Sequence, residues 1–306
     1  MLVLALLVLG CCACWAQNPW DKYNFSPQNR TLVPSQTVHY DEASQSLVYT
    51  DITVGSDGSL KEPFVLNGTG SFVVIAFSKN VAGFTHLSIE DVSDSTQSLG
   101  ITYSESSNYA LCPSTGTGTD CRDGDSQQYA GDHSNGGQGP DGFLSSGPLT
   151  AGMTYTPSVD KMRGGFRYMN VFLQTEGSVT ISAVWVNFTA APTFDIPSDY
   201  ANHFYSSDDS INKVWYGCAY TVQLCTIDPQ HGRKWGPPAS GWDNGNLIGV
   251  GKSILVDGAK RDRTIWPGDM GVSSDALFAT TGDVNSSRWS LETLYGYQDP
   301  VTGMLP

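Results

Sequence analysis

The segment "GFRYMNVFLQTEGSVTISAVWVNF", residues 165–188, indicates the fold of the first part of the chain. Its two halves, 165–174 and 179–188, alternate apolar and polar side chains, which is the period of a half-buried β-strand. Upstream, "SFVVIAFSK" (71–79) is an apolar run of the length expected for a buried strand. Clusters of Gly, Ser, Asn and Asp separate such runs over residues 36–190. We therefore predict an antiparallel β-sandwich, jelly-roll-like, over residues 17–200.

The hydrophobic period changes from strand-like to helical near residue 205. Ser207 is suited to cap a helix whose first turn contains Asp208 and Asp209. Apolar residues then recur at helical spacing as far as Pro229, at Ile211, Val214, Trp215, Cys218, Val222 and Cys225. These features predict a first helix directly after the β part.

Two more helices are expected, from about 271 to 281 and from Asp283 onward, joined at Gly282 as an αα-hairpin. Residues 201–306 are thus predicted to begin an all-α domain. Because three helices do not close a core, we expect the sequence to be a fragment of a longer protein.

Composition excludes several classes of function. The chain has 306 residues and a formal charge of −14, which argues against nucleic-acid binding because phosphates require a basic surface. "GNLIGVGKS" (245–253) has Asn246 where a phosphate-binding loop requires Gly. Five scattered histidines give no metal spacing, so we expect neither a metal nor a cofactor. In the polar insertion 112–147, a surface loop is favoured over a calcium site formed by Asp120, Asp123 and Asp125.

The first residues, "MLVLALLVLGCCACWAQ", predict a secretory signal peptide over 1–16 and no membrane segment after its cleavage. Sequons for N-glycosylation begin at Asn24, Asn29, Asn67, Asn187 and Asn285. In an oxidising compartment, Cys112 and Cys121 flank a short loop and are predicted to form a disulfide. Cys218 and Cys225 lie about 10 Å apart along one helix and cannot bond to each other. We expect a secreted, extracellular glycoprotein.

The segment "VDGAKRDRTIWPGD", residues 256–269, concentrates six charged side chains in a chain that is only 15% charged. It closes a longer region, 231–269, that also contains three tryptophans, Trp235, Trp242 and Trp266. Carboxylates and arginine bind hydroxyls directionally and tryptophan stacks on sugar rings, so a carbohydrate site fits this mixture. From composition alone, buried tryptophans beneath a surface ion-pair network are an equally good interpretation.

The pattern D-G-A-K-R-D-R-x-x-W-P-G-D resembles the active-site segment of α-L-rhamnosidases of glycoside hydrolase family 78, in particular their fungal secreted branch. The resemblance extends to "DKMRGGFRY" (160–168), "VWYGCAYTVQLCTIDP" (214–229) and "SLETLYGYQDPVTGMLP" (290–306). It implies a β-sandwich followed by an (α/α)6 domain of the six-hairpin type, and inverting hydrolysis of terminal α-L-rhamnosides. Within the segment it implies rhamnose binding by Asp257, Arg261, Trp266 and Asp269, with Asp262 as the general acid.

The sequence departs from the commoner bacterial form of this segment, which has an Asp-Glu pair after the arginine with Glu as the acid. Asp262 stands alone between Arg261 and Arg263, and neighbouring cations lower a carboxyl pKa. Its role as an acid therefore requires both arginines to be neutralised, for example by Asp257 and Asp269. The resemblance implies that the general base lies beyond Pro306.

Glu292, which is within the chain, falls in a helix and is interpreted as structural. Two alternatives remain open: a non-catalytic secreted carbohydrate-binding protein, and another glycosidase or a lyase of the six-hairpin superfamily. The sequence leaves the oligomeric state undetermined.

Overall fold

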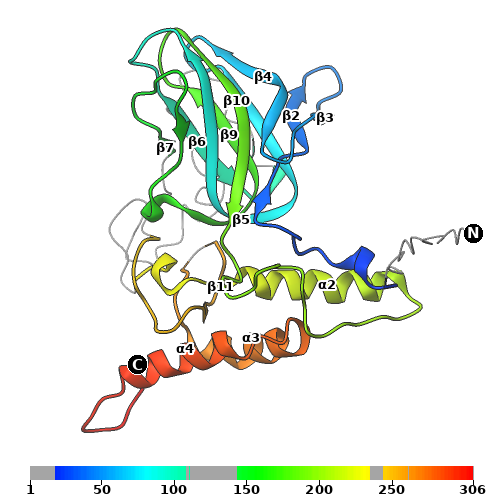
Figure 1. Cartoon of the computed structure of the whole chain (residues 1–306), viewed down its shortest axis with the longest axis vertical. Coiled ribbons are helices and arrows are strands. Elements are labelled where there is room, and N and C mark those ends of the chain that lie inside the picture. Colours follow the sequence, from blue (N-terminus) through cyan, green and yellow to red (C-terminus); the bar gives the residue numbers. More distant parts are fainter. Residues whose placement is uncertain (1–17, 108–109, 111–142, 235–243, 261, 306) are drawn as a thin grey trace, which may run out of the picture.

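The computed structural model describes residues 18–107, 110, 143–234, 244–260 and 262–305. A β part is followed by three α-helices, which lie together at one end of it (Figure 1). Within the described residues the main sheet has ten strands: β1 (Thr31–Leu32), β2 (Gln36–Asp41), β3 (Ser46–Asp51), β4 (Ser59–Asn67), β5 (Phe72–Val92), β6 (Leu99–Ser104), β7 (Leu144–Ser145), β8 (Thr154–Tyr155), β9 (Arg163–Leu173) and β10 (Ser178–Phe188).

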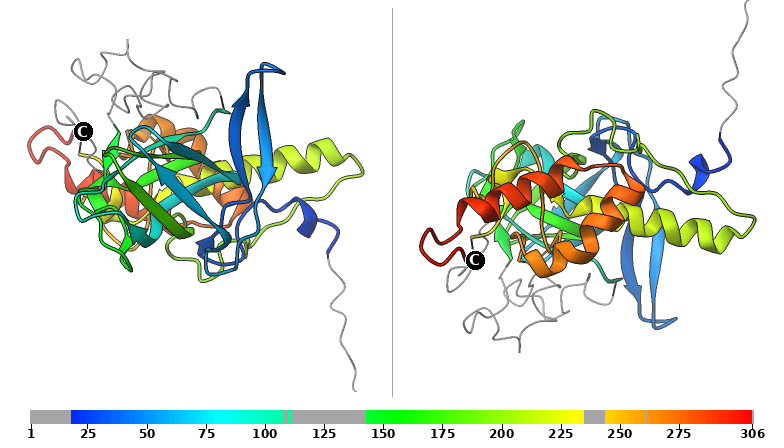
Figure 2. Two further views of the ribbon diagram at one scale, coloured as in Figure 1. Left: turned by 90° about the horizontal axis from the view of Figure 1, so that it is seen from above. Right: turned by 90° about the horizontal axis from the view of Figure 1, so that it is seen from below.

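Every strand pair in this sheet is antiparallel, and the long strand β5 connects its two halves. The first part of β5, residues 72–76, pairs with β2 and β9, whereas residues 83–92 pair with β10. The β2–β3 hairpin, coloured blue, projects from the sheet, to which it is joined by the pairing of β2 with β5 (Figure 2). Side chains from β4, β5, β6, β9 and β10 meet in the largest hydrophobic core. The prediction of a mostly antiparallel β part followed by helices is confirmed.

The two strands that indicated the fold differ in their burial. β10 alternates between buried and partly buried positions along most of its length, as its sequence predicts. β9, in contrast, is buried at all but one of its positions. It lies between β5 and β6, and Tyr168 packs in a second cluster with Val38 and Val74 of β2 and β5. Polar residues such as Asn170 therefore occupy buried positions in the centre of the sheet.

Helix α2 (Asp209–Leu224) forms where the helical period begins, but its cap is Asp208 and not the predicted Ser207. The Asp208 side chain accepts hydrogen bonds from the backbone N–H groups of Ser210 and Ile211, at 2.8 and 3.4 Å. A carboxylate at this position satisfies two N–H groups that have no partner within the helix. The helix ends at Leu224, before the predicted limit at Pro229.

The buried face of α2 also differs from the predicted apolar stripe. Ile211 and Val214 are 51% and 66% exposed. The buried residues are Asn212, Tyr216, Ala219, Tyr220, Val222, Gln223 and Leu224. Polar groups are buried there because they bond to the chain that links the two parts: the Gln223 amide, for example, donates to the Pro197 carbonyl at 2.6 Å.

Two aromatic rings join α2 to the β part. Tyr220 stacks on Phe188 at the end of β10, with ring centroids 6.4 Å apart. Its hydroxyl donates to the backbone carbonyl of Asn80 at 2.6 Å. Burial of the phenol raises its pKa, which keeps the hydroxyl protonated as a donor. The contact fixes the helix against the end of the sheet.

The second and third helices are α3 (Pro267–Thr280) and α4 (Asn285–Gly296). α3 begins four residues earlier than predicted, because Pro267 occupies the first helical turn, where proline is favoured. Gly282, at φ +76°, allows the N–H groups of Thr281 and Gly282 to bond the Leu277 carbonyl and end the helix, as predicted. α4 begins at Asn285, not at Asp283, whose carboxylate accepts from the Ser286 N–H.

Short elements complete the region between α2 and α3. β11 (Thr226–Ile227) pairs with β12 (Ile254–Leu255), and 3-10 turns occur at Asp21–Tyr23, Val159–Lys161 and Pro229–His231. α2 packs against α3, and α4 packs against β12. Among the described residues, no helix is long and apolar enough to cross a membrane.

Candidate functional site

The charged segment 256–269 forms a loop between a buried strand and a helix. Asp257 follows β12, and Asp269 lies in the first turn of α3. The Asp257 N–H donates to the Thr264 carbonyl, and the Thr264 N–H donates to Asp257 Oδ1, both at 3.0 Å. The loop therefore closes on Asp257, whose side chain is half-buried at its base.

The carboxylates of Asp262, in this loop, and of Asp269, in the first turn of α3, act electrostatically on Asp257. Burial, followed by repulsion from Asp262 and Asp269, raises the pKa of Asp257 from 3.8 to about 7, despite the opposing hydrogen bond from Thr264. At neutral pH this carboxyl is thus divided between its acid and its carboxylate form. A carboxylic acid with a pKa near the working pH is suited to donate a proton.

The remaining predicted site residues have different positions. Trp266 is the N-cap residue of α3 and is partly buried, whereas Asp269 is exposed. Arg261 lies outside the described residues, as do Trp235 and Trp242. Asp262 and Asp269 both act electrostatically on Asp257, and Trp266 lies between them in the sequence.

The side chain of Arg263 does not extend over the loop surface beside Asp262 but is buried, with 1% exposure. Its Nε and Nη2 donate to the His231 carbonyl at 3.1 and 2.9 Å, and Nη1 donates to the Ala259 carbonyl. Three hydrogen bonds to backbone carbonyls thus solvate the cation, and the Asp257 carboxylate also acts on it electrostatically. Asp262 itself adopts a left-handed backbone conformation, at φ +61°.

Residues of the β part form the support beneath this loop. Lys260 forms an ion pair with Glu105, just after β6, at 2.7 Å. Gly164 and Gly165, at the start of β9, face Ala259 and Lys260. In the sequence, "DKMRGGFRY" (160–168) was linked to the charged segment only by its resemblance to glycoside hydrolase family 78. The physical signal for this contact was the Gly-Gly pair within a strand, which commonly marks the close approach of another backbone.

Other candidate residues have structural environments. Glu292 lies on α4 and forms an exposed i,i+4 ion pair with Arg288 at 3.6 Å, in agreement with its structural interpretation. Cys218 and Cys225 are both free thiols. Burial raises the pKa of Cys225 to about 11. The predicted Cys112–Cys121 disulfide and the three aspartates of the insertion lie outside the described residues.

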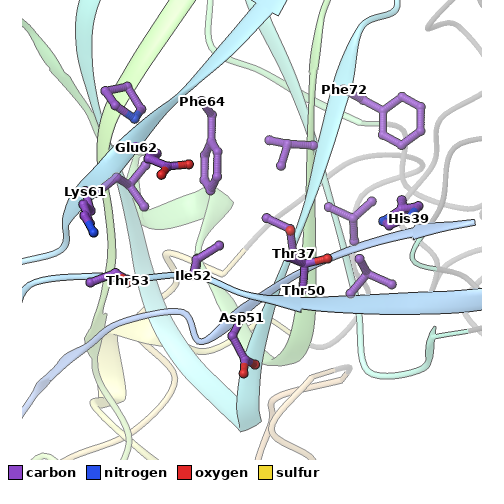
Figure 3. A pocket seen from close by; sticks show the side chains of 15 residues that line it. Thr37, His39, Thr50, Asp51, Ile52, Thr53, Lys61, Glu62, Phe64 and Phe72 are labelled. Atoms are coloured by element: carbon purple, nitrogen blue, oxygen red, sulfur yellow. The ribbon is translucent and has the colours of Figure 1, made fainter.

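A concave region lies on the β part, between the β2–β3 hairpin and β4 (Figure 3). Its volume is about 530 Å³, and its lining is mixed, with Phe64 and Phe72 next to Asp51, Lys61 and Glu62. These strands are not the ones that support the charged loop, so the cavity is separate from the candidate site. Among the described residues, no group of three or more His, Cys, Asp or Glu is arranged to hold a metal ion.

Comparison with known proteins finds a solved structure that shares the fold of this chain. No family model and no curated protein matches the chain. A solved rhamnosidase from Klebsiella oxytoca with rhamnose bound is similar in structure, with a TM-score of 0.53 and 15% sequence identity. The match covers 90% of this chain and 45% of that one, so the chain spans less than half the length of that rhamnosidase.

A GH78 family rhamnosidase of Bacillus sp. GL1 has a TM-score of 0.47 and 15% identity, over 81% of this chain and 21% of its own. The likeness to the Klebsiella protein shows a shared fold. At 15% identity, this likeness does not assign a role to any residue of the loop.

Proposed function

We propose that this chain carries the sugar-binding and proton-donating side of a glycoside hydrolase site that acts on terminal α-L-rhamnosides. The observation that carries the proposal is the half-buried Asp257 at the base of the loop, which is bonded to Thr264 and has its pKa raised to about 7 by burial and by the charges of Asp262 and Asp269. The fold shared with a rhamnose-bound rhamnosidase supports it. In the same proposal, the β part corresponds to a β-sandwich over 17–200, and residues 201–306 to the start of an (α/α)6 domain.

Hydrolysis with inversion needs one carboxylic acid to protonate the leaving oxygen and one carboxylate to activate water. The proposed binders of the rhamnose hydroxyls and ring are Asp257, Arg261, Trp266 and Asp269. Asp262 remains the proton donor proposed from the sequence. The raised pKa of Asp257 makes this residue a second candidate for the same role. No residue of the chain is assigned here as the general base.

Hydrolysis of aryl α-L-rhamnosides with graded leaving groups tests this proposal and separates the two proton donors. Replacing the true donor by Asn should slow release of a poor leaving group by about 10²–10⁴-fold, because the amide cannot supply the proton. An acidic nitrophenol should be affected much less, since it departs without protonation. Asp257→Asn and Asp262→Asn are compared in this assay. If one of these residues only binds the sugar, its variant should lose activity equally on both substrates.

Asp275→Asn provides a matched control, because Asp275 is an exposed aspartate on α3, outside the loop. Its activity and rhamnose affinity should equal those of the wild type. Rhamnose binding measured by calorimetry decides the alternative of a non-catalytic carbohydrate-binding protein. Binding that Trp266→Ala weakens, without turnover of any rhamnoside, would favour that alternative; neither binding nor turnover would contradict the proposed function.

We also propose that the protein is secreted and N-glycosylated. Four of the five sequon asparagines are exposed: Asn29, Asn67, Asn187 and Asn285. Asn24 is only partly exposed, and its side-chain amide donates to the Ser198 carbonyl at 2.9 Å. Expression in a secretory host, with enzymatic removal of N-glycans, tests this: a product retained in cells, with unchanged mass, would contradict it.

A further inference from the structure

Arg263 is a buried cation in the loop that carries the candidate carboxylates. Burial lowers its pKa to about 10, so the guanidinium is still charged at neutral pH. A charge inside a protein must be solvated by hydrogen bonds, and here Nε, Nη1 and Nη2 all donate to backbone carbonyls. The acceptors are His231, before the loop, and Ala259, within it. One side chain therefore ties two separate backbone segments together.

The loop is held in a conformation that its residues do not favour. Asp262 and Arg263 have φ angles of +61° and +48°, in the left-handed region that disfavours side chains with a Cβ. Surrounding contacts must maintain such a conformation. The Arg233 N–H donates to the Arg263 carbonyl at 3.0 Å, and Thr264 and Asp257 bond to each other on the other side. The position of Asp262 depends on these contacts.

Gly164 of β9 is the surface against which Arg263 lies. A Cβ on Gly164 would be 1.7 Å from the Ala259 oxygen and 1.8 Å from Arg263 Nη1, so a side chain and the Arg263–Ala259 contact cannot coexist. The neighbouring Gly165 differs, because its nearest atoms would be 3.6 Å away, an ordinary contact distance. Only one of the two adjacent glycines is therefore required by the packing.

We propose that Arg263 is a positioning residue that, seated against Gly164, locks the loop of Asp257 and Asp262 onto the β part. The β part is then a component of the candidate site and not a separate module. The catalytic consequence of this arrangement rests on the proposed function, whereas the positioning itself does not. Loss of the contact between Arg263 and Gly164 should expose Asp257 and move it away from Asp262 and Asp269.

The first experiment compares Gly164→Ala with Gly165→Ala in the full chain. The readout is the pKa of the Asp257 carboxyl, measured by carbon-detected NMR titration, which requires no substrate. In Gly164→Ala the pKa should fall by about one unit or more toward 3.8, because burial and nearby carboxylates both raise it in the wild type. In Gly165→Ala it should stay at the wild-type value.

The second experiment compares Arg263→Lys with Arg30→Lys. Lysine keeps the positive charge near Asp257 but has one nitrogen in place of the three that bond His231 and Ala259. Arg30 is a matched control, because its guanidinium also donates to backbone carbonyls, of Phe188, Ala190, Ala191 and Phe194, outside the loop. Arg263→Lys should lower the Asp257 pKa, and Arg30→Lys should not.

An unchanged Asp257 pKa in Arg263→Lys, or an equal change in Arg30→Lys, overturns the proposal. If Gly164→Ala does not fold, this second pair of variants still decides it. Hydrolysis of an aryl rhamnoside is measured in parallel. A wild type without hydrolytic activity whose Asp257 still responds to Arg263→Lys would refute the proposed function and leave the positioning role supported. In an active wild type, both loop variants should lower kcat and shift the pH profile, unlike their controls.

Discussion

The raised pKa of Asp257 predicts a stability that falls as pH rises, and Asp257→Asn should remove this dependence. The folded-state pKa is about 7, against 3.8 for a free, solvent-exposed aspartate, a rise of about three units. A group raised in this way stabilises the fold fully below its unfolded pKa, and that contribution is lost as pH rises through the folded pKa. At 1.36 kcal/mol per unit, the full effect is about 4 kcal/mol.

Solvent screening reduces this value, because the Asp257 carboxyl is only half-buried, and we expect about 2 kcal/mol. Asparagine can still accept the Thr264 N–H that Asp257 Oδ1 accepts at 3.0 Å. The variant should therefore match the wild type near pH 4, gain stability between pH 4 and 7, and keep a constant advantage of about 2 kcal/mol above pH 7.

Urea unfolding followed by tryptophan fluorescence, at intervals from pH 4 to 8.5, measures the difference. Asp299→Asn is the control of opposite sign, because backbone N–H groups of Val301 and Thr302 lower the pKa of that carboxyl. Its stability relative to the wild type should not improve with rising pH. A difference between Asp257→Asn and the wild type that is the same at pH 4 and pH 8 would refute the argument that Asp257 is buried among like charges.

Four further predictions rest on the surroundings of single residues. Iodoacetamide at pH 8 should label Cys218, which is exposed, well before Cys225, which is half-buried and whose thiol has a pKa of about 11. Peptide mass spectrometry measures the two rates, and equal rates would contradict the prediction. Gly100→Ala should lower the free energy of unfolding by about 1–3 kcal/mol, because its Cβ would lie 2.0 Å from a neighbouring ring. Gly271→Ala, in open space on α3, should raise it by up to about 1 kcal/mol in the same urea assay. Glycan occupancy in a secretory host should be lowest at Asn24, whose amide is hydrogen-bonded; full occupancy there would contradict this.

Local patterns in the sequence determined which kind of element forms where. The alternation in 179–188 predicted β10, and the change to a helical period predicted α2 and the α3–α4 hairpin with its turn at Gly282. These predictions succeeded because strand and helix periods act over neighbouring residues. The caps were less certain: Asp208 and Ser207 are both good capping residues, and the backbone conformation decided between them.

Only the tertiary structure decided which faces of the helices are buried and which charged side chains are taken out of solvent. The apolar stripe of α2 is partly exposed, because its polar face finds hydrogen-bond partners in the connecting chain. Arg263, adjacent to Asp262 in sequence, turns into the interior, and Asp257, five residues earlier, has the perturbed pKa. The physical reason is that desolvation and electrostatic interaction depend on distances between segments. Gly164, which lies against Ala259 and Arg263, belongs to a strand far from the loop in sequence. The sequence located the charged loop, whereas the tertiary packing decided that Arg263 is buried and Asp257 half-buried.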